Sequence, residues 1–196
     1  METIYVFDMG NVITRPAEFR GIYLEAQSEC EYVEFKNEFY HSADSQLVYK
    51  GFMCDDLFFD LFIDKTKSKI TVPEFRQLYL KYKGSIYGDT LNIITRLKDG
   101  NNMICLLSNL KLIDYEYLRN VIDIGLFDKL FLSYEMHCAK PDREIYEEVI
   151  QELGTNDFYF FDDSIENIIG ASSLGIRAYN VTGDTIKDCF VRKLKK

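Results

Sequence analysis

Polar side chains of five residues stand where short apolar segments of the chain end. They are Asp8, Ser108, Asn109, Asp162 and Asp163. Carboxylates held close together repel one another, so such a cluster either has raised pKa values or binds a cation. Mg²⁺ suits hard oxygen ligands and often combines one or two protein carboxylates with a substrate phosphate. If the fold brings the three aspartates together, the sequence therefore predicts a magnesium site.

The remaining polar groups are consistent with phosphate chemistry at the same place. Ser108 and Asn109 offer a hydroxyl and an amide to phosphate oxygens. Lys140 precedes Pro141 at an expected helix start and offers a compact positive charge. We interpret this set as a candidate site for a phosphate group beside a metal ion.

The elements that must position these residues alternate between strand and helix. Apolar segments that predict buried strands cover 4–7, 103–107, 130–132, 158–161 and 176–181. Helical periodicity covers 89–98, about 111–122, 142–153 and 164–174. Gly100, Gly154 and Gly175 are expected to end helices in the left-handed conformation. This alternation predicts an α/β fold with a parallel sheet, in which ligands bind beyond the carboxyl ends of the strands.

Residues 15–85 interrupt the alternation with a helical insertion. No buried strand is predicted there, and the spacing of the apolar residues indicates amphipathic helices rich in Tyr and Phe. Thr71 and Glu74 have the spacing of a capping box at the start of one helix. We therefore predict an α/β core made of residues 1–14 and 86–196, and a helical module made of residues 15–85.

Composition limits the classes of partner. The 196 residues include 23 Lys and Arg against 32 Asp and Glu, a net charge of -9 that opposes binding to nucleic acid or an anionic membrane. A small molecule is the favoured partner. The 5 cysteines form no C-x-x-C pair, which indicates reduced thiols. Because no basic leader or long apolar segment is present, we expect a soluble, cytoplasmic protein.

Four short motifs occur in order along the chain. They are Phe7 to Ile13, Leu107-Ser108-Asn109, Lys140-Pro141-Asp142 and Phe161-Asp162-Asp163. Their order, their placement at strand ends and the helical insertion between the first two resemble the haloacid dehalogenase-like (HAD) hydrolases over the whole chain. The resemblance implies a Rossmann-like parallel sheet core with a helical cap inserted after the first strand.

The resemblance also implies roles for the motif residues. Asp8 would attack phosphorus to give an aspartyl-phosphate, and Mg²⁺ would bind the Asp8 carboxylate, the Gly10 carbonyl and Asp162. Asp163 would contact the metal ligands rather than the metal ion itself. The residues implied to hold the transferring phosphoryl group are Ser108 and Lys140. The physical logic agrees, because an anionic nucleophile and an anionic phosphate come together only when a cation offsets their repulsion.

Position 10 departs from the family pattern. Most phosphatases of the family carry there an Asp that serves as general acid and base, whereas this chain has Gly10. Because acid–base catalysis contributes about 10²–10⁴-fold, either the rate is low or water or a cap residue supplies the proton. The Asp-x-Gly-Asn-Val form resembles a subgroup of phosphatases specific for α-glucose 1-phosphate, whose leaving oxygen needs less protonation. The expected function is thus Mg²⁺-dependent hydrolysis of a small phosphorylated metabolite, with a sugar phosphate as the expected substrate.

Several alternatives stay open. The alternative function is a phosphate-binding protein of the same fold with little or no turnover, because Gly10 replaces the usual acid/base Asp. Asp163 could instead cap the helix that follows it. Asn11 is expected to adopt a turn conformation, and His41 is expected to be a surface or cap residue rather than a base.

Overall fold

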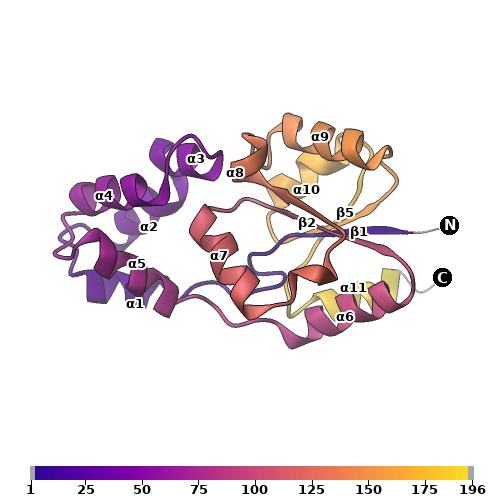
Figure 1. The fold of residues 1–196 in the computed structure, drawn as a ribbon, viewed down its shortest axis with the longest axis horizontal. Helices are drawn as coiled ribbons and strands as arrows, with labels where there is room; N and C mark the ends of the chain where they lie inside the picture. The colour runs from indigo at the N-terminus through magenta and orange to yellow at the C-terminus, as the bar shows by residue number, and fades with distance from the viewer. Residues whose placement is uncertain (1–2, 194–196) are drawn as a thin grey trace.

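The computed structural model describes residues 3–193, which contain one parallel sheet and flanking helices (Figure 1). The strands are β1 (Ile4–Phe7), β2 (Met103–Ser108), β3 (Lys129–Leu132), β4 (Tyr159–Asp162) and β5 (Arg177–Asn180). Their order in the sheet is β3-β2-β1-β4-β5, and every neighbouring pair is parallel. The predicted α/β class with a parallel sheet is therefore confirmed.

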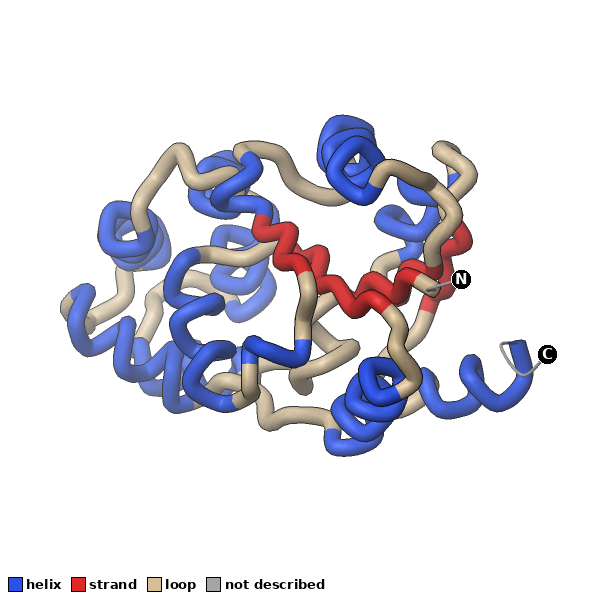
Figure 2. The backbone as a smooth tube through the Cα atoms, turned by 45° about the vertical axis from the view of Figure 1, so that its right-hand side comes forward, coloured by secondary structure: helices blue, strands red, loops and turns tan. Residues whose placement is uncertain are grey.

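Helices cover both faces of the sheet (Figures 1 and 2). One face packs against α9 (Arg143–Leu153) and α10 (Ile165–Ser172). The other packs against α6 (Gly88–Asp99), α7 (Leu112–Val121) and α11 (Ile186–Lys193). Successive strand residues face opposite sides, so that Val6 joins the first of these two cores and Phe7 the second. Two short helices, η1 (Ile124–Leu126) and α8 (Ser133–Met136), flank β3.

Five further helices lie between β1 and α6 in the chain. They are α1 (Phe19–Ala26), α2 (Tyr32–His41), α3 (Ala43–Tyr49), α4 (Asp55–Thr66) and α5 (Val72–Lys81). This helical group packs around its own aromatic core, which includes Phe35, Phe39, Phe59 and Phe75. The predicted capping box is present, since the Thr71 backbone N–H donates to Glu74 Oε2 at 2.7 Å. In Figure 1 the helical group lies at the end of the molecule toward which the strands run.

Two details of the sequence interpretation are wrong. Gly100 has φ -77° rather than a left-handed conformation; the left-handed residue after α6 is Asn101, with φ 59°. The chain continues past the end of α6 by one residue, Gly100, and reverses at Asn101, because Asn tolerates the left-handed conformation better than most residues. Segment 176–181 is not a buried strand, because β5 forms an edge of the sheet and exposes Arg177 and Asn180. Gly154 and Gly175 are left-handed as expected.

None of the helices in residues 3–193 combines the length and apolarity that a bilayer crossing needs.

Candidate active site

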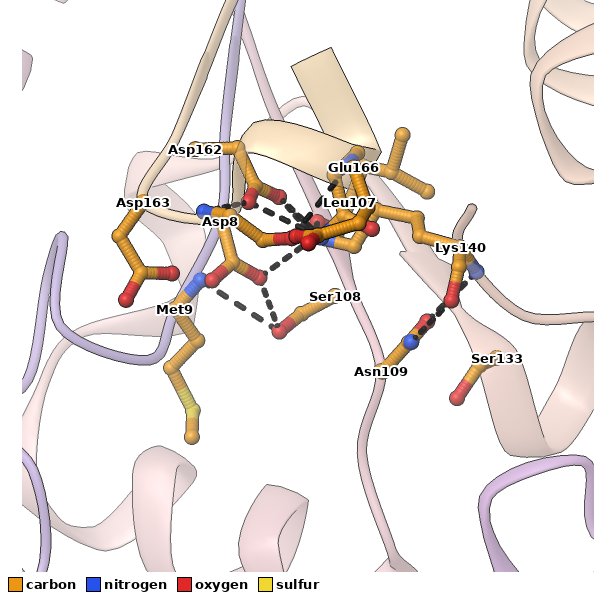
Figure 3. Close-up of polar contacts among 12 residues, drawn as sticks. Asp8, Met9, Leu107, Ser108, Asn109, Ser133, Lys140, Asp162, Asp163 and Glu166 are labelled. Carbon is orange, nitrogen blue, oxygen red and sulfur yellow. Dashed lines mark hydrogen bonds and ion pairs between the residues drawn. The ribbon is translucent and has the colours of Figure 1, made fainter. Parts of the chain in front are cut away.

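Three adjacent strands bring the predicted site residues to one edge of the sheet (Figure 3). Asp8 follows the central strand β1, Ser108 ends β2 on one side of it, and Asp162 ends β4 on the other. All three are buried. Asp8 and Ser108, which are 100 positions apart in the sequence, become neighbours because the carboxyl ends of parallel strands lie at the same edge.

Asp8 is held at one oxygen by two donors. Its Oδ1 accepts hydrogen bonds from Ser108 Oγ at 2.6 Å and from Lys140 Nζ at 2.7 Å. Ser108 Oγ accepts in turn from the Met9 backbone N–H at 3.4 Å. Among residues 3–193 no partner is found for Asp8 Oδ2, which lies 3.8 Å from the position that a Cβ on Gly10 would take. One oxygen of Asp8 is thus fixed, and the other is available to a ligand.

Lys140 lies between two carboxylates. It is in the loop before α9, it is buried, and its Nζ also donates to Asp162 Oδ2 at 2.6 Å and to the Leu107 carbonyl at 2.9 Å. An ammonium group has three donors, so all of them are engaged. The ammonium therefore offsets part of the repulsion between Asp8 and Asp162.

The charges of this cluster are only partly balanced. Burial raises the pKa of Asp8 to about 6, Asp162 adds to the increase, and Lys140 opposes it. Burial alone would lower the pKa of Lys140, but the two carboxylates outweigh it and raise that pKa. An excess of negative charge in a buried place favours a cation.

Asp163 completes a group of three carboxylates. One oxygen of each of Asp8, Asp162 and Asp163 lies within 4.8 Å of the others. Asp163 Oδ2 accepts from Asn11 Nδ2 at 2.9 Å, while burial raises its pKa. These three carboxylates, one of which has the unpartnered oxygen Asp8 Oδ2, fit the ligand preferences of Mg²⁺.

The structure shows which residue caps α10 and which conformation Asn11 adopts. Ser164 rather than Asp163 caps α10, because Ser164 Oγ accepts from the Asn167 backbone N–H at 3.4 Å. The capping interpretation of Asp163 is therefore wrong. Asn11 has the expected turn conformation, with φ 55°, and its hydrogen bond to Asp163 had no signal in the sequence.

Two asparagines support the site through other residues. Asn109 Nδ2 donates to the Lys140 carbonyl at 2.7 Å, and its Oδ1 accepts from the Lys140 backbone N–H at 2.9 Å. Its amide thus holds the Lys140 loop, and direct contact with phosphate stays a prediction. Asn167, which sequence reasoning missed, donates to both oxygens of Asp162 at 2.9 and 3.1 Å. The sequence predicts a helix directly after Asp162 and Asp163, and the first turn of such a helix lies close to these two residues. That prediction is the signal that could have pointed to Asn167.

A cavity of about 880 Å³ lies over the cluster. Asp8, Gly10 and Lys140 line it from the sheet, and the helical group contributes side chains that include Tyr40 and Tyr49. A small molecule that reaches Asp8 would therefore be surrounded by both parts of the chain.

Residues 3–175 match the family model described as haloacid dehalogenase-like hydrolase. The chain therefore belongs to the HAD-like hydrolases, and the resemblance found in its four motifs is confirmed at the family level.

Two curated relatives match part of the chain. The sesquiterpene phosphatase astK of Aspergillus oryzae is 30% identical over 101 residues, which are 50% of this chain and 51% of that protein. The drimenol cyclase drtB of Aspergillus calidoustus is 32% identical over 91 residues, or 45% of this chain and 17% of that protein. The matches thus span about half or less of these relatives.

Solved structures share the fold over nearly the whole chain. A HAD family enzyme from Bacteroides thetaiotaomicron, solved as a magnesium complex, superposes with a TM-score of 0.82 at 22% identity and covers 98% of this chain and 99% of its own. The same enzyme was also solved with magnesium and inorganic phosphate, at a TM-score of 0.76, 21% identity and coverage of 93% and 96%. A predicted HAD-like hydrolase from Porphyromonas gingivalis gives a TM-score of 0.81 at 19% identity, with coverage of 100% and 99%.

Proposed function

We propose that this HAD-like hydrolase is a Mg²⁺-dependent phosphatase that cleaves a small phosphomonoester through an aspartyl-phosphate on Asp8. The observation that carries the proposal is the buried Asp8 carboxylate, fixed at Oδ1 by Ser108 and Lys140 and unpartnered at Oδ2. Related folds crystallised with magnesium and phosphate support it, as does the match to a phosphatase.

The chemistry assigns each residue a task. A carboxylate oxygen of Asp8 forms a bond to phosphorus while the bond from phosphorus to the leaving oxygen breaks. Ser108 and Lys140 keep Asp8 in place and bind the phosphoryl oxygens. Water then attacks the aspartyl-phosphate, which releases inorganic phosphate and regenerates the Asp8 carboxylate.

Asp8, Asp162 and the Gly10 carbonyl are the proposed ligands of Mg²⁺, with Asp163 supporting them. When bound, Mg²⁺ supplies positive charge to phosphoryl oxygens and to the carboxylates around them. Helices in residues 15–85 are proposed to act as a cap over a core made of residues 1–14 and 86–196.

The substrate must compensate for Gly10, which offers no proton to the leaving group. An anomeric phosphate leaves as a hemiacetal oxygen, a better leaving group than a simple alkoxide. A sugar phosphate is therefore our proposed substrate, in keeping with the resemblance to α-glucose-1-phosphate phosphatases.

The test is phosphate release from sugar phosphates and p-nitrophenyl phosphate, with and without Mg²⁺, by the wild type and by Asp8→Asn. We expect metal-dependent turnover that falls by about three orders of magnitude or more in Asp8→Asn, because the variant keeps the side-chain shape but removes the nucleophile. The matched control is Asp60→Asn, which changes an exposed aspartate of α4 and should retain wild-type turnover.

Undiminished turnover in Asp8→Asn would refute the nucleophile assignment. A wild type that binds inorganic phosphate but cleaves no ester would instead support the alternative, a phosphate-binding protein in which Gly10 accounts for the lost catalysis.

A further inference from the structure

A second polar centre lines the cavity that contains Asp8. Lys83 lies between α5 and α6, Asp114 lies in the first turn of α7, and Tyr79 projects from α5. The Lys83 ammonium contacts Asp114 Oδ1 and donates to Tyr79 Oη at 2.9 Å, while Tyr79 Oη donates to Asp114 Oδ1 at 2.6 Å. The side chains of Lys83 and Asp114 are only 10% and 5% exposed. The hydrolytic chemistry assigned to Asp8 uses none of these groups.

A contribution to packing alone does not explain why a charged pair is buried at this place. Burial lowers the pKa of Lys83 in spite of the neighbouring carboxylate, so the ion pair is strongly desolvated. Well-packed apolar side chains of similar volume can often replace a buried ion pair without loss of stability. A centre that lines the substrate cavity has a further use, because its groups can contact what the cavity holds.

The centre retains hydrogen-bonding capacity toward the cavity. Lys83 has two acceptors within residues 3–193, whereas an ammonium has three donors. Tyr40 and Tyr49 also line this cavity. Donors and acceptors are therefore offered side by side.

This arrangement discriminates between classes of leaving group. An apolar chain placed against the centre would leave the third donor of Lys83 without an acceptor. A hydroxyl group both donates and accepts, so it satisfies both partners of the pair.

We infer that Lys83, Asp114 and Tyr79 form a specificity site that binds hydroxyl groups of the leaving group. The enzyme then prefers phosphomonoesters of polyhydroxylated alcohols to those of terpenyl or aryl alcohols. The inference rests on the proposed phosphatase function, to which it adds the residues that select the substrate class.

The test compares three kinds of ester with Mg²⁺ present: a panel of hexose and glycerol phosphates, geranyl phosphate, and p-nitrophenyl phosphate. The wild type should give a higher kcat/KM for the best polyol phosphate than for geranyl phosphate. In Lys83→Met, the ratio of kcat/KM for that polyol phosphate to kcat/KM for p-nitrophenyl phosphate should fall about 10- to 100-fold, since a charged hydrogen bond to one substrate is lost.

Two further variants keep the test decisive. Tyr79→Phe removes only a hydroxyl and should lower the same ratio about 3- to 10-fold, which decides the matter if Lys83→Met does not fold. Lys81→Met is the matched control, because Lys81 is 58% exposed and paired with Glu25, and its ratio should equal that of the wild type.

An equal loss on both esters, leaving the ratio unchanged in Lys83→Met and Tyr79→Phe, would assign the centre a structural role and overturn the inference. A wild type that prefers geranyl phosphate would overturn it while the phosphatase proposal stands. A wild type that cleaves no ester at all would refute the proposed function and this inference together.

Discussion

At the scale of single residues, Lys140 is fully engaged before any substrate arrives. Its three donors bind Asp8, Asp162 and the Leu107 carbonyl. A phosphoryl group that reaches Lys140 must therefore share or displace one of these acceptors. The ammonium is already located between the carboxylates, so little reorganisation is needed when a negatively charged ligand binds.

Gly10 is the residue at which the site can be extended. A Cβ added there would have Asp8 Oδ2, at 3.8 Å, as its nearest contact, so the backbone leaves room for a side chain. We predict that Gly10→Asp raises kcat by about 10²-fold on alkyl phosphates, because a carboxylic acid can protonate a poor leaving group. Turnover of p-nitrophenyl phosphate, whose leaving group needs no proton, should change little in the same assay.

Gly10→Asn is the control for this prediction, since it has the same shape without an acidic proton. Equal gains by Gly10→Asp on both esters, or gains by Gly10→Asn as large as those by Gly10→Asp, would contradict general acid catalysis from position 10.

At the scale of elements, two connecting segments join the helical group to the sheet and run close together. The Arg15 backbone N–H donates to the Ser85 carbonyl at 2.7 Å, and Thr14 forms a bridge with Ile86. A Cβ on Gly84 would lie 1.8 Å from the Arg15 carbonyl oxygen. This close approach of two backbones explains why residue 84 lacks a side chain.

Gly84→Ala should therefore lower the free energy of unfolding by about 1–3 kcal/mol, because one of the two backbones must move. Urea denaturation measures the change. Gly88→Ala is the matched control, since a Cβ there has no neighbour within 4 Å and Ala favours the first turn of α6. If the two variants were equally stable, the steric account of Gly84 would be wrong.

At the scale of the whole molecule, α7 belongs to both parts of the structure. Lys111 precedes it and is buried with its ammonium 4.3 Å from the Phe39 ring centre and 4.2 Å from that of Tyr49. The Ile113 backbone N–H donates to Asp55 Oδ2 at 2.8 Å. The helix that follows the Ser108 strand is thus anchored in the helical group, which couples the position of that group to the candidate active site.

Asp114, in the first turn of α7, makes the stability of the contact between α7 and the helical group sensitive to acid. Burial would raise its pKa, but the Lys83 and Lys111 ammonium groups outweigh burial and, with a hydrogen bond from Tyr79, lower it to about 2. Because this folded-state pKa lies below the ordinary value of 3.8, ionised Asp114 stabilises the fold above about pH 4, and this stabilisation is lost as the pH falls toward 2. The contribution is about 2 kcal/mol.

We expect Asp114→Asn to lack this part of the pH dependence, so that its free energy of unfolding falls less steeply than that of the wild type between pH 4 and 2. Urea denaturation at several pH values provides the measurement, with Asp60→Asn as the exposed control. Parallel curves for the wild type and Asp114→Asn would contradict the assignment.

The sequence by itself determined the class of fold and the main catalytic candidates. Apolar segments ending in Asp8, Ser108 and Asp162 predict strand ends, and the parallel-sheet rule places those ends together. The capping box at Thr71 is equally local, because its hydrogen bonds join residues one helical turn apart. These features depend on apolar patterns and hydrogen bonds within short segments, so the local sequence is sufficient to predict them.

Only the tertiary structure decided which distant side chains meet. The pairing of Lys83 with Asp114 joins residues 31 positions apart, and the use of the Asn109 amide to hold the Lys140 backbone spans the same separation. Neither pairing repeats with the period of a helix or strand, so no local pattern announces it. These contacts arise because the segment after α5 lies beside the start of α7, and β2 lies beside the loop before α9, so that buried polar groups of one segment pair with those of the other.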